Sequence, residues 1–126
     1  MNTNKKVNKR TLVIGASVKP ERYSNKAIKL LTEYGHEVVA LAKRQGSVEG
    51  IPIETVFPQN DDIHTVSLYV GPAHQPEYYD QLLSLNPRRV IFNPGTENSE
   101  LKEKLDKAGI TTVEGCTLVM LRYGYY

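Results

Sequence analysis

Short apolar runs alternate with helical patterns along this chain, and the alternation limits the fold more than any other feature. The run at residues 11–14 is almost entirely apolar, as in a strand that is buried on both faces of a sheet. Between Ala27 and Tyr34 apolar side chains recur at helical spacing, and Gly35 follows as a left-handed helix cap. The alternation predicts an α/β, Rossmann-like fold of three layers, in which helices cover both faces of a parallel sheet.

The sheet is expected to hold five main strands in the spatial order 2-1-3-4-5. They are expected at residues 11–14, 36–42, 65–70, 89–92 and 110–113, with room for an extra edge strand at residues 51–56. Helices are expected from Ser24 or Asn25 to Tyr34, from near Gln75 to before Pro87, from Asn98 or Ser99 to Gly109, and from Leu118 to Tyr123. With 126 residues the chain fits one domain, residues 11–126, behind a flexible basic N-terminus of residues 1–10.

Charge and composition exclude several classes of function. The net charge of +2 is too small to indicate a nucleic-acid-binding protein. A single cysteine rules out an internal disulfide and a cysteine-cluster zinc site, and the three histidines do not repeat at metal-ligand spacing. No apolar run approaches the roughly 20 residues of a membrane span, and no signal-peptide segment follows the basic start. We therefore expect a cytoplasmic protein with a small-molecule ligand, no nucleic-acid or membrane partner, and a monomeric or weakly dimeric state.

Ligands of open parallel sheets bind outside the carboxyl ends of the strands, where the strand order reverses. In this sequence small or turn-forming residues follow nearly every expected strand, and they let a ligand approach the backbone amides. The corresponding loops are Gly15-Ala16-Ser17, Lys43-Arg44, Val70-Gly71-Pro72, Asn93-Pro94-Gly95-Thr96 and Gly115-Cys116-Thr117.

The first of these loops is a partial dinucleotide-binding fingerprint. Gly15 fits the first glycine of G-x-G-x-x-G, but Ser17 and Pro20 occupy the places of the second and third. Backbone amides, the Ser17 hydroxyl and a charge from Lys19 or Arg22 would hold a diphosphate there. The alternative is a strand–helix turn that needs small residues only for packing.

Two cations, Lys43 and Arg44, follow the second expected strand. NAD-binding folds usually place Asp or Glu near this point to hold the ribose 2′-OH. Two cations suit a phosphate on the adenosine ribose, as in coenzyme A or NADP. A solvated pair without a ligand is the alternative.

The last two loops carry polar and sulfur-containing side chains. Asn93, Thr96 and Glu97 bring several hydrogen-bonding groups together around the tight turn at Pro94-Gly95, although a purely structural turn would use the same residue types. Cys116 opens the last expected helix. A nucleophilic cysteine normally needs a base beside it, and packing as a small apolar side chain is the favoured interpretation.

Four segments together resemble the small, stand-alone CoA-binding proteins, which are similar to the CoA-binding domain of the succinyl-CoA synthetase α subunit. They are Gly15-Ala16-Ser17, Pro20-x-Arg22-Tyr23-Ser24-Asn25, Phe92-Asn93-Pro94-Gly95-Thr96-Glu97-Asn98 and Cys116-Thr117-Leu118-Val119-Met120. The resemblance extends from about residue 11 to residue 123. It implies a Rossmann-like fold that binds coenzyme A.

The resemblance also implies a set of contact residues. The first loop and the start of the first helix would contact the diphosphate, and the second loop would contact the 3′-phosphate of the adenosine. The third loop would line a wall of the site, and the last two loops would lie toward the pantetheine. The implied residues are Gly15, Ala16, Ser17, Arg22 and Ser24; Lys43; Val70, Pro72 and Gln75; and Asn93, Pro94, Gly95, Thr96 and Cys116. Many relatives carry Pro-x-Asn-Pro after the second strand and two prolines after the third, whereas this chain has Ala42-Lys43-Arg44-Gln45 and Gly71-Pro72.

Three hypotheses of function follow. The first is a protein that binds coenzyme A or an acyl-CoA without catalysis of its own, because no substrate domain and no Ser–His–Asp or Cys–His arrangement is visible in sequence order. The second is an NADP-binding oxidoreductase or a nicotinamide-sensing protein, in which Lys43-Arg44 would take the 2′-phosphate. The third is an interaction protein whose fold has lost its ligand. The small residues at the strand ends count against this third hypothesis.

Overall fold

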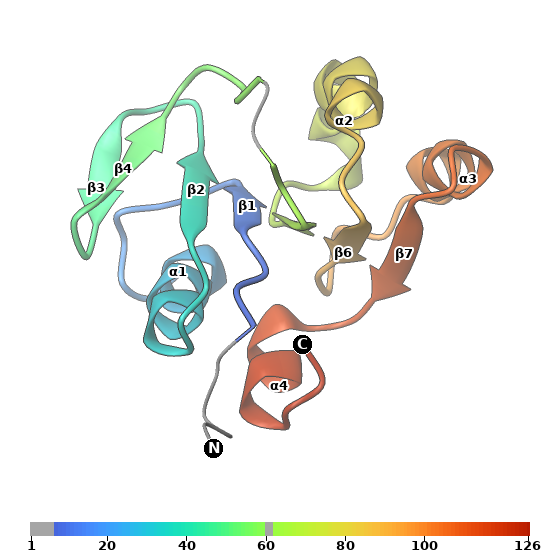
Figure 1. The fold of residues 1–126 in the computed structure, drawn as a ribbon. Helices are drawn as coiled ribbons and strands as arrows, with labels where there is room; N and C mark the ends of the chain where they lie inside the picture. Colours follow the sequence, from blue (N-terminus) through green and yellow to red (C-terminus); the bar gives the residue numbers. More distant parts are fainter. Residues whose placement is uncertain (1–6, 60–61) are drawn as a thin grey trace.

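A seven-stranded sheet forms the centre of the molecule, in the order β3-β4-β2-β1-β5-β6-β7 (Figure 1). The computed structural model describes residues 7–59 and 62–126. The strands are β1 Thr11–Ile14, β2 Val38–Leu41, β3 Gly46–Val48, β4 Ile51–Glu54, β5 Thr65–Leu68, β6 Arg89–Phe92 and β7 Thr111–Glu114.

All neighbouring strands run parallel except β3, which pairs antiparallel with β4. The central strand β1 pairs with β2 on one side and β5 on the other, so that Leu12 lies opposite Val39 and Val66. The chain passes from β1 outward to β2 and returns to β5, and the strand order therefore reverses at β1. A crevice is expected at the carboxyl end of that strand.

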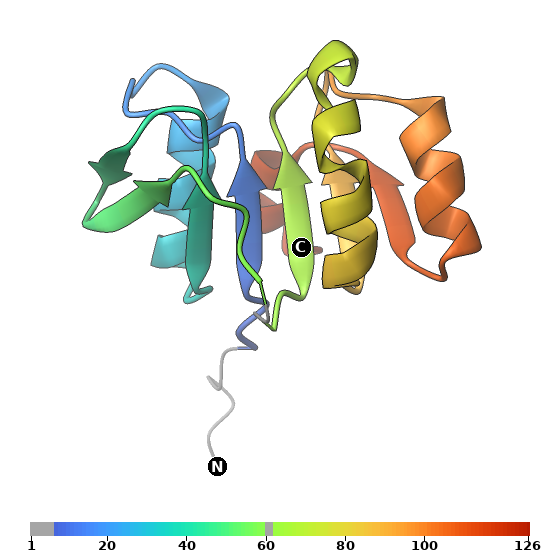
Figure 2. The ribbon, with the colours of Figure 1, turned by 90° about the horizontal axis from the view of Figure 1, so that it is seen from above.

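Helices cover both faces of the sheet, α1 and α4 on one and α2 and α3 on the other (Figures 1 and 2). Their bounds are α1 Tyr23–Glu33, α2 Tyr79–Leu85, α3 Ser99–Lys107 and α4 Thr117–Arg122, and two 3₁₀ turns, η1 Pro72–His74 and η2 Pro76–Tyr78, precede α2. Strand residues alternate between the two faces, so that Leu12 and Ile14 join one apolar core while Val13 joins the other. The apolar stripes of α1 and α3, at Ile28 and Leu105 for example, are fully buried.

The expected fold class and the order of the five main strands are confirmed. The bounds of the first and fourth expected strands agree with β1 and β6. The extra strand expected at residues 51–56 appears as β4, but it is not an edge strand, because β3 lies outside it. Strand β3 was not expected. It forms because Glu49 and Gly50, both with positive φ, make a tight two-residue turn that folds it back onto β4.

Two local expectations differ from the structure. Neither Ser24 nor Asn25 caps the first helix, because α1 begins at Tyr23 and Arg22 is its N-cap residue without a side-chain hydrogen bond. The expected flexible N-terminus lies outside the described residues as far as position 6. From Asn8 onward the segment is held instead: the Asn8 amide donates to Glu37 at 2.6 Å and the Lys9 backbone amide donates to His36 at 2.9 Å.

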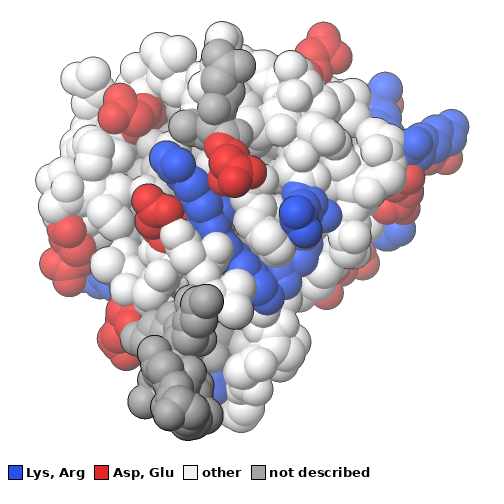
Figure 3. Space-filling view, viewed as in Figure 1, with Lys and Arg blue, Asp and Glu red and all other residues white. Residues whose placement is uncertain are grey.

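The amino ends of the strands surround a polar hollow of about 250 Å³. Arg10, Glu37, His64 and Arg88, which directly precede β1, β2, β5 and β6, line it together with Asn8 and Asp62. On the face drawn in Figure 3, Lys and Arg side chains near the middle lie beside Asp and Glu side chains. Within the described part of the chain, no helix has the length and apolar character needed to cross a bilayer.

Candidate functional site

The loops that follow the parallel strands meet at the carboxyl end of the sheet, beside the reversal of strand order. Gly15 directly follows β1, the strand at which the order reverses, and has φ of +96°. A Cβ atom at Gly15 would lie 3.0 Å from the Tyr69 carbonyl carbon and 3.1 Å from Val70 Cγ1. Only glycine therefore lets the loops after β1 and β5 come this close.

The first loop is fastened to the end of β2. The backbone amides of Gly15 and Ala16 both donate to the Leu41 carbonyl, at 2.9 and 3.1 Å. The Asn25 side chain, buried in α1, donates to the Ser17 carbonyl at 2.8 Å. A ligand would therefore meet the loop from Ser17 onward, because the two preceding amides are already engaged.

A cleft of about 490 Å³ separates the first loop from the segment that follows β2. Three cationic residues line it, Lys19 from the first loop and Lys43 and Arg44 from the second. The other lining residues are Ala16, Ser17, Val18, Ala42, Gln45 and Ile53. We call this space the Lys43 cleft; its shape and charge suit an anionic ligand.

Lys43 is paired across the crevice with Glu77 of η2, at 2.5 Å between Nζ and Oε1. The Lys43 side chain is nevertheless 73% exposed, and its ammonium group lies 5.8 Å from the centre of the Tyr78 ring. The hydrogen bond with Glu77 raises the pKa of Lys43, so the ammonium group is charged at neutral pH. A phosphate entering the cleft would compete with Glu77 for this cation.

Gln75 braces two loops from inside the protein. Its side chain is fully buried, and its amide donates to the carbonyls of Val70, at 3.0 Å, and Thr96, at 2.7 Å. Its carbonyl accepts from Asn98 at 2.9 Å. Gln75 was expected to line a wall of the ligand site; in the structure its side chain is buried and holds the loops after β5 and β6 together.

Asn93 has a similar position below the crevice, at 1% exposure. Its amide donates to the Ser67 hydroxyl at 2.9 Å and the Leu68 carbonyl at 2.8 Å. Its side-chain oxygen accepts from the Thr117 backbone amide at 2.8 Å, at the start of α4. Asn93 therefore ties β5, β6 and α4 together.

A second pocket, of about 360 Å³, is lined by residues of α1 and α4 and by residues that follow β5, β6 and β7. Three residues expected from the sequence line it: Asn93, Pro94 and Cys116. Tyr23, Tyr69, Leu118, Val119 and Arg122 complete the lining. We call this space the α1–α4 pocket.

Burial raises the pKa of Tyr69 to about 12. The nearby hydroxyls of Ser67 and Thr117 act in the opposite direction, but neither is placed for a hydrogen bond with the Tyr69 hydroxyl. The phenol is therefore neutral at physiological pH.

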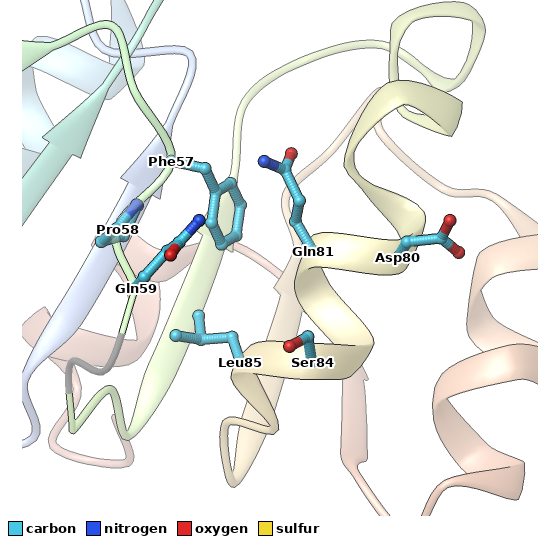
Figure 4. Close-up of a pocket in the computed structure, with 7 residues that line it drawn as sticks. All are labelled: Phe57, Pro58, Gln59, Asp80, Gln81, Ser84 and Leu85. Carbon is cyan, nitrogen blue, oxygen red and sulfur yellow. The ribbon is translucent and has the colours of Figure 1, made fainter.

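A third hollow, of about 440 Å³, lies between α2 and the segment that joins β4 to β5 (Figure 4). Phe57 and Leu85 lie on opposite sides of it, and none of the residues expected to bind a ligand lines it. Its only charged lining residue among those described is Asp80. It lacks the cations that a nucleotide phosphate would need.

The structure sorts the expected site residues into two groups. Ser17, Arg22, Lys43, Val70, Pro72, Pro94, Gly95 and Cys116 are exposed or half-buried, as is Gly15, while Ala16, Ser24, Gln75, Asn93 and Thr96 are buried. Ala16, Ser17 and Lys43 share the Lys43 cleft. The expected residues that line neither that cleft nor the α1–α4 pocket are Gly15, Arg22, Ser24, Val70, Pro72, Gln75, Gly95 and Thr96.

Sequence reasoning missed Glu77, Tyr69 and Val119. Tyr69 directly follows the end of β5, so its position at a strand's carboxyl end was the available signal. Glu77 lies 34 positions from Lys43, and no pattern in the sequence joins them. Among the described residues, no group of three or more His, Cys, Asp or Glu side chains is placed to hold a metal ion.

The reversed strand order, the glycine-dependent first loop and the cationic cleft at the strand ends define an α/β protein of the Rossmann-like, nucleotide-binding class. The family model described as "CoA binding domain" matches residues 9–122. The chain belongs to this CoA-binding domain family.

Solved structures share the fold of this chain. One, a crystal structure of an uncharacterized protein, is 44% identical, with a TM-score of 0.93, and the match covers 96% of this chain and all of the other. A hypothetical protein from Pyrococcus horikoshii OT3 is 31% identical, with a TM-score of 0.83. That match covers 92% of this chain and 83% of the other.

A dinucleotide-forming acetyl-coenzyme A synthetase 1 from Ca. Korarchaeum cryptofilum shares the fold at 17% identity and a TM-score of 0.67. That match covers 86% of this chain and 26% of the synthetase chain. A comparison with curated proteins finds no match.

Proposed function

We propose that this protein binds coenzyme A, or an acyl-CoA, at the carboxyl ends of its parallel strands and performs no catalysis of its own. The Lys43 cleft carries the proposal, because it places three cationic residues beside the first loop at the reversal of strand order. The 3′-phosphate would lie at Lys43 and the diphosphate beside Ser17 and Lys19. Membership in the CoA-binding domain family supports the same ligand.

Lys43→Ala is expected to weaken the binding of coenzyme A about tenfold and to leave dephospho-CoA almost unaffected. The substitution removes a charge-assisted hydrogen bond to the 3′-phosphate, and the exposed position of Lys43 limits the size of the loss. Isothermal titration with both ligands measures the difference. Lys107→Ala is the matched control, because Lys107 is 77% exposed and paired with Glu103 on α3. An unchanged gap between the two ligands in Lys43→Ala would remove Lys43 from the phosphate site.

Glu77→Gln is expected to strengthen the binding of coenzyme A by about twofold to fivefold. The substitution removes the carboxylate that competes for Lys43, and an exposed ion pair of this kind stabilises by at most about 1 kcal/mol. Dephospho-CoA should bind with unchanged affinity. Glu103→Gln, at the partner of Lys107, is the control. Equal gains for both ligands would show that Glu77 acts by general repulsion rather than through Lys43.

The cationic residues of the Lys43 cleft would also suit the 2′-phosphate of NADP, and a thermal-shift panel separates the two ligands. Coenzyme A at 100 times its dissociation constant should add about 2.7 kcal/mol of stability. Stabilisation by NADPH alone would overturn the proposal. The proposed absence of catalysis does not rest on the histidines, because His36 and His64 precede β2 and β5 at the opposite end of the sheet whereas His74 lies in η1, after β5. Release of free thiol from acetyl-CoA in the presence of the protein would contradict it.

A further inference from the structure

The α1–α4 pocket adjoins the path that a bound coenzyme A would take. Ser17 lines the Lys43 cleft, and Tyr69 lines the α1–α4 pocket. The cleft is lined mainly by the segments after β1 and β2, and the pocket includes residues that follow β5, β6 and β7, so both lie along the carboxyl edge of the sheet. A ligand bound along this edge, with its nucleotide portion in the Lys43 cleft, would extend toward the α1–α4 pocket.

The lining of this pocket is mainly apolar and aromatic. Tyr23 is 69% exposed and Val119 is 39% exposed, one from α1 and one from α4. Large apolar side chains left exposed beside a ligand crevice are typical of a binding surface. Of the described residues that line the pocket, only Arg122 is charged, and a long arginine side chain can cover apolar surface while its charge stays in water.

Tyr69 adds no charge to the lining of the pocket, because its phenol stays neutral at physiological pH. The volume of about 360 Å³ lies at the lower end of the range for small-molecule sites, roughly 300–1,000 Å³. The pocket therefore suits a short apolar group better than a second nucleotide or a charged ligand.

We infer that the α1–α4 pocket receives the short apolar acyl chain of an acyl-CoA thioester. This inference rests on the proposed function, because the thioester reaches the pocket only when the coenzyme A portion occupies the strand ends. The preferred ligand is then a short-chain to medium-chain acyl-CoA rather than free coenzyme A. The apolar pocket supplies the discrimination, and the Lys43 cleft supplies binding that is common to all of these ligands.

Titration of the purified protein with coenzyme A, acetyl-CoA, butyryl-CoA and hexanoyl-CoA tests the inference. Each fully buried methylene group should strengthen binding about fourfold. Because the pocket is partly open, we expect at least about a tenfold gain from acetyl-CoA to hexanoyl-CoA. An affinity that is flat or falls with chain length overturns the acyl site.

Val119→Asp gives a variant with a charge in the pocket. Val119 lies at an exposed position of α4, so the change should leave the fold intact. The ratio of hexanoyl-CoA to acetyl-CoA affinity is expected to fall to about one. Val56→Asp is the matched control, because Val56 is 75% exposed and lines neither the pocket nor the Lys43 cleft. A ratio in Val119→Asp equal to that of the control overturns the inference.

The same titrations distinguish failure of the inference from failure of the proposed function. If coenzyme A binds and chain length has no effect, the acyl site is wrong and the function stands. If neither coenzyme A nor any acyl-CoA binds, both are wrong. If hexanoyl-CoA binds tightly while the Val119→Asp ratio falls, both are supported.

Discussion

Gly15→Ala is expected to lower the free energy of unfolding by about 3 kcal/mol or more and to weaken the binding of coenzyme A. The φ angle of +96° is unfavourable for any residue with a Cβ atom, which costs about 1–2 kcal/mol. The added methyl group would also lie 3.0 Å from the Tyr69 carbonyl carbon, and overpacking of this kind typically costs about 1–3 kcal/mol. Urea denaturation and titration with coenzyme A measure the two effects.

Gly50→Ala is the control that isolates the backbone contribution. Gly50 has φ of +80°, but no atom lies within 4 Å of the position its Cβ would take. The expected loss of stability is therefore about 1 kcal/mol, with no change in ligand binding. Equal losses in the two variants would show that the loops after β1 and β5 move apart easily at Gly15.

Asn93→Ala should lower the free energy of unfolding by about 3 kcal/mol. The substitution leaves the Leu68 carbonyl and the Thr117 amide without the side chain that pairs with them in the native structure. Leaving a buried polar group unpaired costs about 1–3 kcal/mol, and the small side chain also opens a cavity. Thermal and urea denaturation measure the effect, and hydrogen exchange at the start of α4 should accelerate.

Thr96→Val tests the same region with a smaller change. The Thr96 hydroxyl donates to the Asn93 carbonyl at 2.8 Å, and the Thr96 backbone amide donates to the same oxygen at 2.9 Å. Because that oxygen keeps one donor after the substitution, we expect a loss of about 1 kcal/mol. A loss as large as that of Asn93→Ala would mean that the loop, rather than the Asn93 amide, determines stability here.

The sheet could be predicted because its strands are read from local runs of apolar residues. Strands β1 and β6 agree with their expected bounds, since an uninterrupted apolar run has few alternatives to a strand buried on both faces. The N-cap of α3 was expected at Asn98 or Ser99, and it is Asn98, whose side chain accepts from the backbone amides of Glu100 and Leu101. Such features depend on neighbours in sequence, which a single chain displays directly.

Strand β3 and the start of α1 could not be predicted for the opposite reason. Strand β3 has only three residues and begins with Gly46, and its formation depends on pairing with β4. Helix α1 begins without a side-chain cap, so the capping rule pointed to Ser24 and Asn25, which are buried instead. Tertiary packing overrides local preference at both places.

The candidate site shows the same limit. Position at a strand end identified Lys43 and Ser17, which share a cleft, but the burial of Gln75 and Asn93 depends on partners in other loops. Sequence position alone does not distinguish an exposed residue at a strand end from a buried one. The pairing of Lys43 with Glu77 likewise requires the three-dimensional arrangement of β2 and η2.

The buried side chains of Gln75 and Asn93 separate the shape of the crevice from its chemistry. The loop positions are set from behind, whereas Ser17, Lys43 and Val119 face outward without carrying the fold. Substitutions at such outward positions usually change stability by no more than about 0.5 kcal/mol. A few substitutions at such outward positions can therefore change the ligand preference, because each of them costs little stability. The fold is for this reason readily adapted in evolution or by design.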